Sequence, residues 1–166
     1  MIDIYQFLNQ HHIAYQRHDH PAVFTCEEAD RLVPDLPAAK TKNLFLRDNK
    51  GRNHFLVIVG SEKSVDLKAL RDVIGSSKLS LGSAERLQKY LGVTPGAVSL
   101  LALVNDVAHA VKLFVDRDLW QAPAFRFHPL VNTSTLVLGR QKVERFLKAT
   151  GHELNVIDVP AFEKNE

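Results

Sequence analysis

The chain has 166 residues, of which 45% are hydrophobic and 24% are charged. This composition is that of a soluble globular protein, and the length allows a domain to bury a core without disulfides or metals. The 21 basic and 19 acidic residues give a formal net charge of +2, too small to indicate nucleic-acid binding by itself. The single cysteine excludes an internal disulfide framework and fits a reducing compartment.

Neither a targeting signal nor a membrane segment is evident. The opening residues, MIDIYQFLNQ, lack the basic region and long apolar run of a signal peptide. No apolar stretch approaches the roughly 20 residues that span a bilayer. We therefore expect a cytoplasmic protein with no membrane contact. No domain boundary, internal repeat or low-complexity segment interrupts residues 1–166, which predicts a single domain.

The first part of the chain predicts helix, strand and helix. Residues 3–12 carry apolar positions at helical spacing behind an aspartate N-cap and predict a short amphipathic helix. A strand is expected at 13–18. Thr25, followed by Glu28 three residues later, forms a capping-box pattern, which predicts a second helix over 26–33.

The next part predicts a hairpin and two helices. Apolar runs at 43–47 and 55–59 flank the turn sequence DNKGRN and predict an antiparallel pair. The second run is apolar throughout, which indicates a central strand covered on both faces. Helices are expected at 67–74 and 83–91, each followed by a glycine, with a short strand at 79–81.

The last part is mixed. Residues 97–106 are apolar without clean periodicity and favour neither helix nor strand. Strands are expected at 111–115 and 154–159, and a helix around 143–147. Since helices and strands are interspersed and several strands have hairpin-length links, the sequence predicts an α/β (α+β) fold with a mixed, largely antiparallel sheet and surrounding helices.

Residues 125–138, FRFHPLVNTSTLVL, stand out as strand, polar corner and strand. Such a corner places an imidazole, an amide and hydroxyls at the end of a sheet, beside free backbone N–H groups. Polar loops on a rigid scaffold often carry binding and catalytic groups. Asn, Thr and Ser also form ordinary turns, and the segment alone leaves both interpretations open.

A local cluster of cations is a second candidate feature. Such a ridge suits phosphate contacts but is also typical of a solvated face. Lys42 precedes Asn43 at the start of a strand, where a lysine either belongs to a site or protects a sheet edge. The cations fall within thirteen residues, opposed there only by Asp48: Lys40, Lys42, Arg47, Lys50 and Arg52.

Other constellations carry weaker signals. His18 and His20 lack further ligands at zinc spacing. Cys26, at the expected start of a helix, suits a nucleophile, but no partner histidine is identifiable and a lone cysteine is commonly a small buried residue. The segment 60–64 lacks the spacing of a nucleotide-hydrolysing loop. We therefore expect no metal and no organic cofactor.

Five ordered motifs together resemble the YbaK/prolyl-tRNA-synthetase-associated editing domains, most closely the freestanding PrdX (ProXp-ala) branch. The resemblance covers nearly the whole chain. It implies a compact α/β domain with a barrel-like sheet. The motifs are HPAVFTCEEA at 20–29, KTKNLFLRD at 40–48, HFLVIV at 54–59, LGVTPGAVSLLALVND at 91–106 and FRFHPLVNTSTLVL at 125–138.

The resemblance also implies an activity and its partners. The expected function is a trans-editing deacylase that hydrolyses alanine mischarged onto proline tRNA, without a cofactor. The expected partner is the mischarged tRNA, with transient contact to prolyl-tRNA synthetase, and the protein is expected to be a monomer. Rival interpretations are a deacylase for cysteinyl- or seryl-tRNA, a non-catalytic module that binds tRNA or synthetase, and a hydrolase dependent on Cys26.

The motifs assign roles to individual residues. Lys42 matches the family's lysine, expected to contact the terminal nucleotide and its phosphate, and Asn43 matches the adjacent pocket asparagine. His128 matches the histidine of the site corner, where it orders the corner or a water. Core packing is the alternative for the three apolar pocket walls at 23, 24 and 45. The expected substrate-binding residues are Val23, Phe24, Thr25, Phe45, Gly96, Ser99, Leu130, Asn132 and Thr133.

One departure from the family pattern concerns the pocket. The family usually has proline after the serine of the glycine-containing segment, whereas Leu100 follows Ser99 here. This departure bears on the local shape of the loop. The shape of this loop, and hence the size of the pocket, is therefore the part of the resemblance that the structure must decide.

Overall fold

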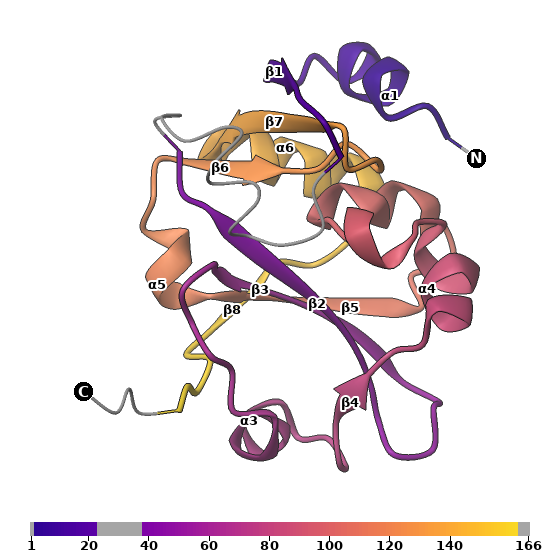
Figure 1. Ribbon diagram of the computed structural model, residues 1–166, viewed down its shortest axis with the longest axis vertical. Coiled ribbons are helices and arrows are strands. Elements are labelled where there is room, and N and C mark those ends of the chain that lie inside the picture. The colour runs from indigo at the N-terminus through magenta and orange to yellow at the C-terminus, as the bar shows by residue number, and fades with distance from the viewer. Residues whose placement is uncertain (1, 23–37, 163–166) are drawn as a thin grey trace.

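The computed structural model describes residues 2–22 and 38–162, and its strands form two sheets (Figure 1). The smaller sheet is antiparallel, with the order β1 (Gln16–Asp19), β7 (Ser134–Gly139) and β6 (Ala124–Phe127). The larger sheet has the order β4 (Ser80–Leu81), β2 (Thr41–Arg47), β3 (His54–Gly60), β5 (Val111–Asp116) and β8 (Asn155–Ile157). Its first three strands are antiparallel, whereas β3, β5 and β8 run parallel.

The predicted fold class, a mixed and largely antiparallel sheet with surrounding helices, is confirmed, but the sheet is not closed into a barrel. The two sheets are linked through one bridge between Ala39 and Phe125. In the described part of the chain the ladder to β6 does not continue past this bridge, and from Thr41 onward β2 pairs with β3 along its other edge. The consequence is two layers that share a corner near the start of β2.

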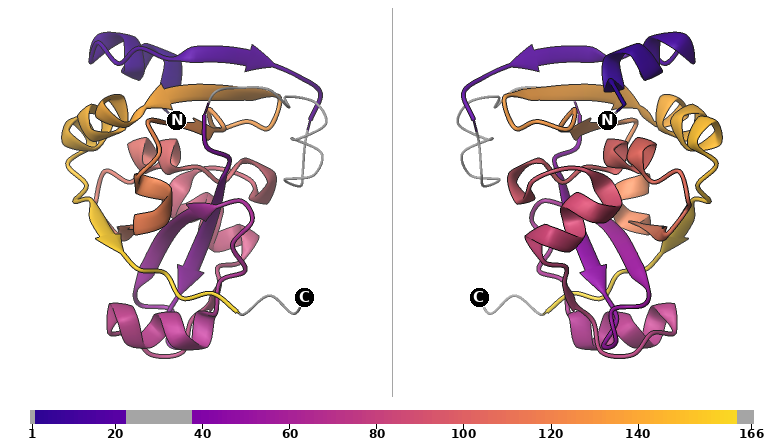
Figure 2. Two further views of the ribbon diagram at one scale, coloured as in Figure 1. Left: turned by 90° about the vertical axis from the view of Figure 1, so that its left-hand side faces the viewer. Right: turned by 90° about the vertical axis from the view of Figure 1, so that its right-hand side faces the viewer.

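Helices pack outside these layers. Figure 2 shows α1 and α6 beside the three-stranded sheet and α3 at the opposite end of the molecule. Among the described residues, no helix is long and apolar enough to cross a membrane. The helices are α1 (Ile4–Gln10), α3 (Leu67–Ile74), α4 (Ala84–Leu91), α5 (Arg117–Trp120) and α6 (Arg140–Thr150), with 3₁₀ helices η1 (Pro95–Ala97) and η2 (Leu100–Asn105).

The central strand β3 is buried from His54 to Val59, as its apolar run predicted. Leu56 and Ile58 belong to the main core, which fills the space between the two sheets. Phe55 and Val57 belong to a second cluster together with Leu70 of α3. Because successive side chains of β3 point to opposite faces, the strand contributes residues to both clusters.

Two segments differ from expectation for identifiable reasons. β1 begins at Gln16 rather than at residue 13, because residues 11–13 close α1. The His12 N–H donates to Asn9 O and the Ile13 N–H donates to Leu8 O, the hydrogen-bond pattern of a Schellman cap. The aperiodic segment 97–106 contains 3₁₀ helices, whose three-residue period matches neither template. The helix expected at 26–33 lies outside the described residues.

Candidate active site

Within the described residues, the start of β2 is an open strand edge. Lys42 and Asn43 are adjacent in this strand, and strand geometry sends their side chains to opposite faces. β4 pairs only with Leu46 and Arg47. Among the described residues, no strand pairs with residues 41–44 on that side. A ligand that lies along this edge can therefore reach both side chains.

Asn43 is held at both ends of its amide. Its Oδ1 accepts a hydrogen bond from the Leu100 backbone N–H at 3.0 Å. Its Nδ2 donates to Thr41 Oγ1 at 3.2 Å, and the Thr41 hydroxyl donates to the backbone carbonyl of Arg126 at 2.6 Å. These bonds join β2 to η2 and to β6, two residues before His128.

The residues at the start of η2 complete this hydrogen-bond network. Ser99 is fully buried, its backbone is extended (φ −156°, ψ 149°), and its Oγ accepts a hydrogen bond from the Leu101 N–H at 3.1 Å. Leu100 is the first residue of η2 and is buried in the main core. Gly96 lies in η1 and is partly exposed. The structure thus brings Ser99 and Leu100 against Asn43.

Lys42 points toward the turn that follows β3. Its ammonium donates to the backbone carbonyl of Lys63. Lys63 in turn forms an ion pair with buried Asp116 at 2.7 Å. Burial lowers the pKa of Lys63, but the carboxylates of Asp116 and Asp118 outweigh burial and leave that pKa above its usual value. Lys63 is therefore a charged structural group.

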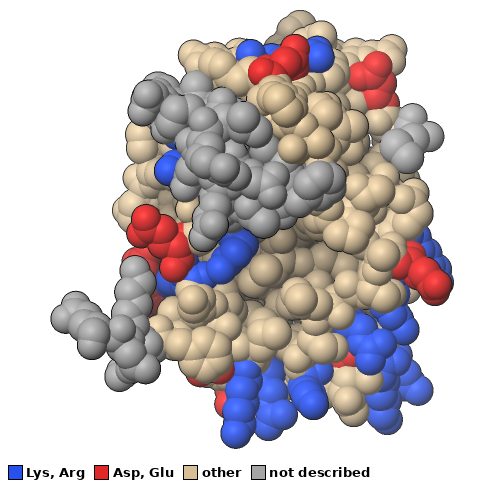
Figure 3. Space-filling model, in the orientation of Figure 1, with Lys and Arg blue, Asp and Glu red and all other residues tan. Residues whose placement is uncertain are grey.

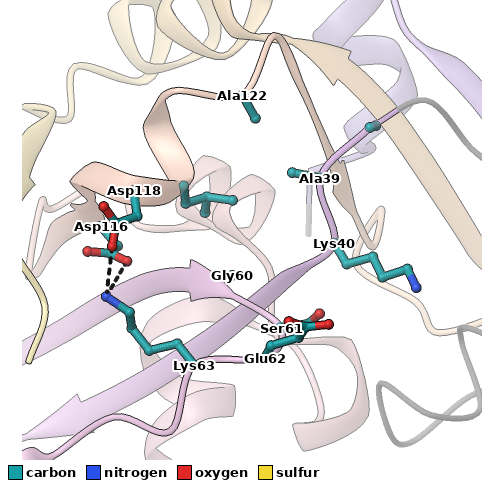
Figure 4. A pocket seen from close by; sticks show the side chains of 11 residues that line it. Ala39, Lys40, Gly60, Ser61, Glu62, Lys63, Asp116, Asp118 and Ala122 are labelled. Atoms are coloured by element: carbon teal, nitrogen blue, oxygen red, sulfur yellow. Dashed lines mark hydrogen bonds and ion pairs between the residues drawn. The ribbon is translucent and has the colours of Figure 1, made fainter. Parts of the chain in front are cut away.

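A cleft of about 550 Å³ opens beside this ion pair, between the start of β2, the turn after β3 and α5 (Figure 4). Figure 4 shows Lys40 and the Asp116–Asp118 pair at different sides of the cleft. Lys63 lines the cleft, and Lys42 donates to its carbonyl, so Lys42 lies at the margin. The cleft is lined by the carboxylates of Glu62, Asp116 and Asp118 as well as by Lys40 and Lys63. The end near Lys40 and Lys42, rather than the cleft as a whole, therefore suits a ligand that carries a phosphate.

His128 follows directly after β6 and bridges the polar corner to β7. Its Nδ1 lies 3.0 Å from the backbone carbonyl of Ser134. A carbonyl only accepts, so Nδ1 carries the proton and Nε2 presents a lone pair. Burial lowers the pKa of His128, the Ser134 carbonyl opposes this, and His20 adds to the lowering. The imidazole is therefore neutral at pH 7.

The corner itself is compact. Leu130 has a positive φ of 68°, uncommon for a residue with a β-carbon, and its side chain packs against the main core. Asn132 is half-buried, whereas Thr133 is exposed. The Thr133 carbonyl accepts a hydrogen bond from the His20 N–H at 2.9 Å. The corner is thus anchored to the core on one side and to the end of β1 on the other.

His20 belongs to this corner, although from the sequence it was considered only as a zinc ligand that lacked partners. Its Nε2 lies 2.8 Å from Thr135 Oγ1, and its ring centroid lies 6.3 Å from that of His128. The pairing of β1 with β7 brings together residues 115 apart in sequence. Thr41, which supports Asn43, was also missed. Both lie within the motifs at 20–29 and 40–48, which are the only signal that could have pointed to them.

Of the remaining predicted pocket residues, the structure describes only Phe45. The Phe45 ring stacks on His54, with centroids 5.6 Å apart, and a β-carbon on Gly82 would meet that ring at 2.4 Å. Phe45 shares its face of β2 with Asn43, but its ring is buried in the main core. The predicted positions Val23, Phe24 and Thr25, like Cys26, lie outside the described residues.

Comparisons with curated proteins give close relatives. The prolyl-tRNA editing protein ProX of Acetoanaerobium sticklandii is 40% identical over 152 residues, covering 92% of this chain and 93% of that protein. The prolyl-tRNA synthetase associated domain-containing protein 1 of Danio rerio is 34% identical, covering 90% of this chain and 82% of that protein.

Solved structures support the fold. The hypothetical protein APE2540 superposes with a TM-score of 0.75 at 19% identity, covering 95% of this chain and 99% of that one. A candidate trans-editing enzyme for prolyl tRNA synthetase gives a TM-score of 0.70 at 20% identity, covering 94% of each chain. The family model of the aminoacyl-tRNA editing domain matches residues 20–146. The family inferred from the motifs is therefore confirmed, and this chain belongs to the aminoacyl-tRNA editing domain family.

Proposed function

We propose that this protein hydrolyses the ester that joins alanine to mischarged proline tRNA. Membership of the family makes it an aminoacyl-tRNA deacylase that acts in trans on mischarged tRNA. The proposal concerns the amino acid, the tRNA and the residues that act. The ProX relative, described as a prolyl-tRNA editing protein, supports proline tRNA as the carrier.

The observation that carries the proposal is the hydrogen-bonded connection from Leu100 through Asn43 and Thr41 to Arg126. It fixes a side-chain amide at the start of β2 and ties it to β6, the strand that His128 directly follows. A cleft with lysines lies at the same end of β2. An amide, a neutral imidazole and nearby cations suit an aminoacyl ester on a ribose phosphate, because they can bind its polar groups and its phosphate.

The proposed reaction is a direct hydrolysis. A water oxygen bonds to the carbonyl carbon, the ester bond to the ribose oxygen breaks, and the proton from water ends on the ribose hydroxyl. Lys42 binds the phosphate of the terminal nucleotide, and Asn43 binds the amino acid end. His128 orders the corner or, through Nε2, the water. The tRNA's neighbouring ribose hydroxyl helps to position that water. Because the ester is already activated, orientation and polarisation suffice.

Selection of alanine follows from size. A synthetase pocket built for proline excludes alanine weakly, because each missing methylene is worth only ~1–3 kcal/mol. A second site that admits only small side chains supplies the missing discrimination. We propose Val23, Phe24, Phe45 and Leu130 as walls of that site. The other predicted binding residues, Thr25, Gly96, Ser99, Asn132 and Thr133, complete the proposed pocket.

The test is deacylation of alanyl-, cysteinyl-, seryl- and prolyl-tRNA(Pro) by the purified protein. We expect rapid loss of alanine with proline spared, and a fall of about 100-fold or more in the Lys42→Ala variant, the scale of one lost transition-state contact. Lys148→Ala, which removes an exposed lysine from α6, is the matched control and should keep full activity.

The same assay separates the rival functions. Loss of cysteine or serine instead of alanine would retain the chemistry and change the amino acid. Failure to hydrolyse all four substrates would contradict the proposed activity and favour a module that only binds tRNA or synthetase. Complete inactivation by Cys26→Ala would replace the water mechanism with a covalent one.

A further inference from the structure

We propose that the backbone N–H of Leu100 is a positioning group that makes Asn43 a hydrogen-bond donor to the carbonyl of the substrate ester. The inference rests on the proposed function and adds the direction in which the Asn43 amide acts. It also gives a role to the position at which this chain departs from the family's usual proline.

The direction of the Asn43 amide follows from the chemistry of its partners. A backbone N–H can only donate, so the atom 3.0 Å from Leu100 N must be the carbonyl oxygen of Asn43. The Asn43 nitrogen then faces Thr41 Oγ1 at 3.2 Å. The Thr41 hydroxyl donates its proton to the Arg126 carbonyl, so the Thr41 oxygen accepts the hydrogen bond from Asn43. All three bonds fit one assignment of protons, and the flipped amide would place two N–H groups against each other.

This assignment leaves Asn43 with one further N–H. An amide nitrogen carries two hydrogens, and only one is directed at Thr41. The carbonyl oxygen is occupied by Leu100, so Asn43 can offer the substrate a donor but not an equally good acceptor. A fixed donor stabilises the negative charge that develops on an ester oxygen during attack by water.

The loop that carries Leu100 is built to present this N–H. The first N–H groups of a helix have no partner within the helix. In η2 the Ser99 hydroxyl takes the Leu101 N–H and the Asn43 carbonyl takes the Leu100 N–H. Ser99, Leu100 and Leu101 are all buried to 1% exposure or less, so neither N–H has water as an alternative partner. The buried Leu100 N–H requires an acceptor, and its hydrogen bond to Oδ1 fixes the orientation of the Asn43 amide.

A proline at position 100 would fit the backbone and remove this donor, together with the leucine side chain. Ser99 already has the extended conformation that precedes proline, and the first position of a helix accepts proline. A chain with proline at this position needs another means to orient its asparagine. The Leu100→Pro variant is therefore a close test of the N–H, once the loss of the leucine side chain is controlled.

The experiment compares Leu100→Pro with Leu100→Ala on alanyl-tRNA(Pro), at a temperature where circular dichroism shows both variants folded. Both lose the leucine side chain, but only alanine keeps the N–H. We expect kcat for Leu100→Pro to fall by about tenfold relative to Leu100→Ala, with KM changed much less, because the donor acts in the transition state. Asn43→Asp keeps an acceptor for Leu100 and loses the donor, and should fall by about 100-fold.

Equal rates for the proline and alanine variants would overturn the proposal, because side-chain volume would then explain any loss. A Leu100→Pro variant that does not fold leaves a second measurement. Amide hydrogen exchange at Leu100 in the wild-type protein should be slow and should accelerate in Asn43→Ala, and unchanged protection would also overturn it. A wild-type protein that hydrolyses none of the four aminoacyl-tRNAs would instead contradict the proposed function, and the exchange measurement would still report on the amide.

Discussion

His128 is a neutral imidazole whose tautomer is set by the main chain, and this gives its role a pH dependence. Ser134 O fixes the proton on Nδ1, and burial holds the pKa below the usual value of about 6.5. The Nε2 lone pair therefore persists below pH 6.5 and is lost only on further acidification. If that lone pair orients the water, deacylation falls on the acid side with a midpoint below about 6.5.

Single-turnover rates between pH 4.5 and 7.5 check this expectation. His128→Gln retains an N–H for Ser134 O but has no group that titrates in this range, so its lower rate should lack the acid limb. His109→Gln, which changes a histidine outside the proposed site, should retain the limb. An unchanged limb in His128→Gln would assign the titration to another group.

At the scale of single residues, the sequence named candidate site residues but not the contacts between them. Lys42 and Asn43 are adjacent in the chain, yet alternation along β2 sends them to opposite faces. Leu100 was marked by its departure from the family pattern, whereas its N–H mattered only once Asn43 was seen 57 residues away. Thr41 and His20 lie within the quoted motifs but were given no role, because their contacts depend on strand pairings that no local pattern specifies.

One buried carboxylate, that of Asp106, fixes the loop that connects η2 to β5. Asp106 accepts hydrogen bonds at 2.9 Å from the N–H groups of Ala110 and Val111 and from His152 Nε2. Burial alone would raise the pKa of Asp106, but the hydrogen bonds from His152 and the backbone outweigh burial and leave it below the usual value. The charged carboxylate therefore stabilises the fold.

Asp106→Asn should lower the free energy of unfolding by about 2–3 kcal/mol at pH 7, the scale of buried hydrogen bonds to a charged group. The folded-state pKa of Asp106 is depressed, so its contribution is present above about pH 4 and disappears as the pH falls through the folded pKa. Urea unfolding at pH 7 and pH 3 measures both effects, and the variant should lose less stability on acidification. Asp72→Asn, an exposed change in α3, is the control. Equal stability of Asp106→Asn and Asp72→Asn would contradict the assignment.

Elements with local signals were predicted well. α3 and α4 lie where their patterns placed them, because Asp66 and Ser83 cap their first turns and Gly75 and Gly92 end them with positive φ. These signals act within a few residues. The 3₁₀ helices around Ser99, the end of α1 and the short helix α5 were missed, because their conformation depends on packing and on hydrogen bonds to distant segments. The barrel-like closure implied by the resemblance also depends on such long-range pairing.

At the scale of the whole molecule, the basic ridge of the sequence divides into two parts. Lys40 and Lys42 lie at the cleft end of β2. Its other members lie at the far end, around the β2–β3 turn, and Figure 3 shows Lys and Arg side chains gathered along that lower edge of this face. Arg47 lies four residues beyond Asn43 on the same face of β2, or roughly 13 Å away at the rise of a strand.

The β2–β3 turn has exposed cations, whereas its one carboxylate is buried and hydrogen-bonded within the turn. Asp48 is buried and accepts hydrogen bonds from the N–H groups of Arg52 and Asn53 and from the Asn53 amide. Lys50 and Arg52 are exposed. This positive surface lies along β2 from the proposed ester site. It is suited to the phosphates of the tRNA acceptor arm.

We therefore expect the double variant Lys50→Glu/Arg52→Glu to raise KM for alanyl-tRNA(Pro) and to reduce the slope of log KM against log salt concentration by about 2, one unit for each lost phosphate contact. Hydrolysis of a short alanyl oligonucleotide that ends in CCA should be unaffected, since it does not reach the turn. Lys142→Glu/Lys148→Glu on α6 changes the net charge equally, on a helix at the other end of the molecule (Figure 1), and is the matched control. Equal effects of the two double variants would show that net charge alone matters, and the acceptor arm would then have to follow another path from the cleft.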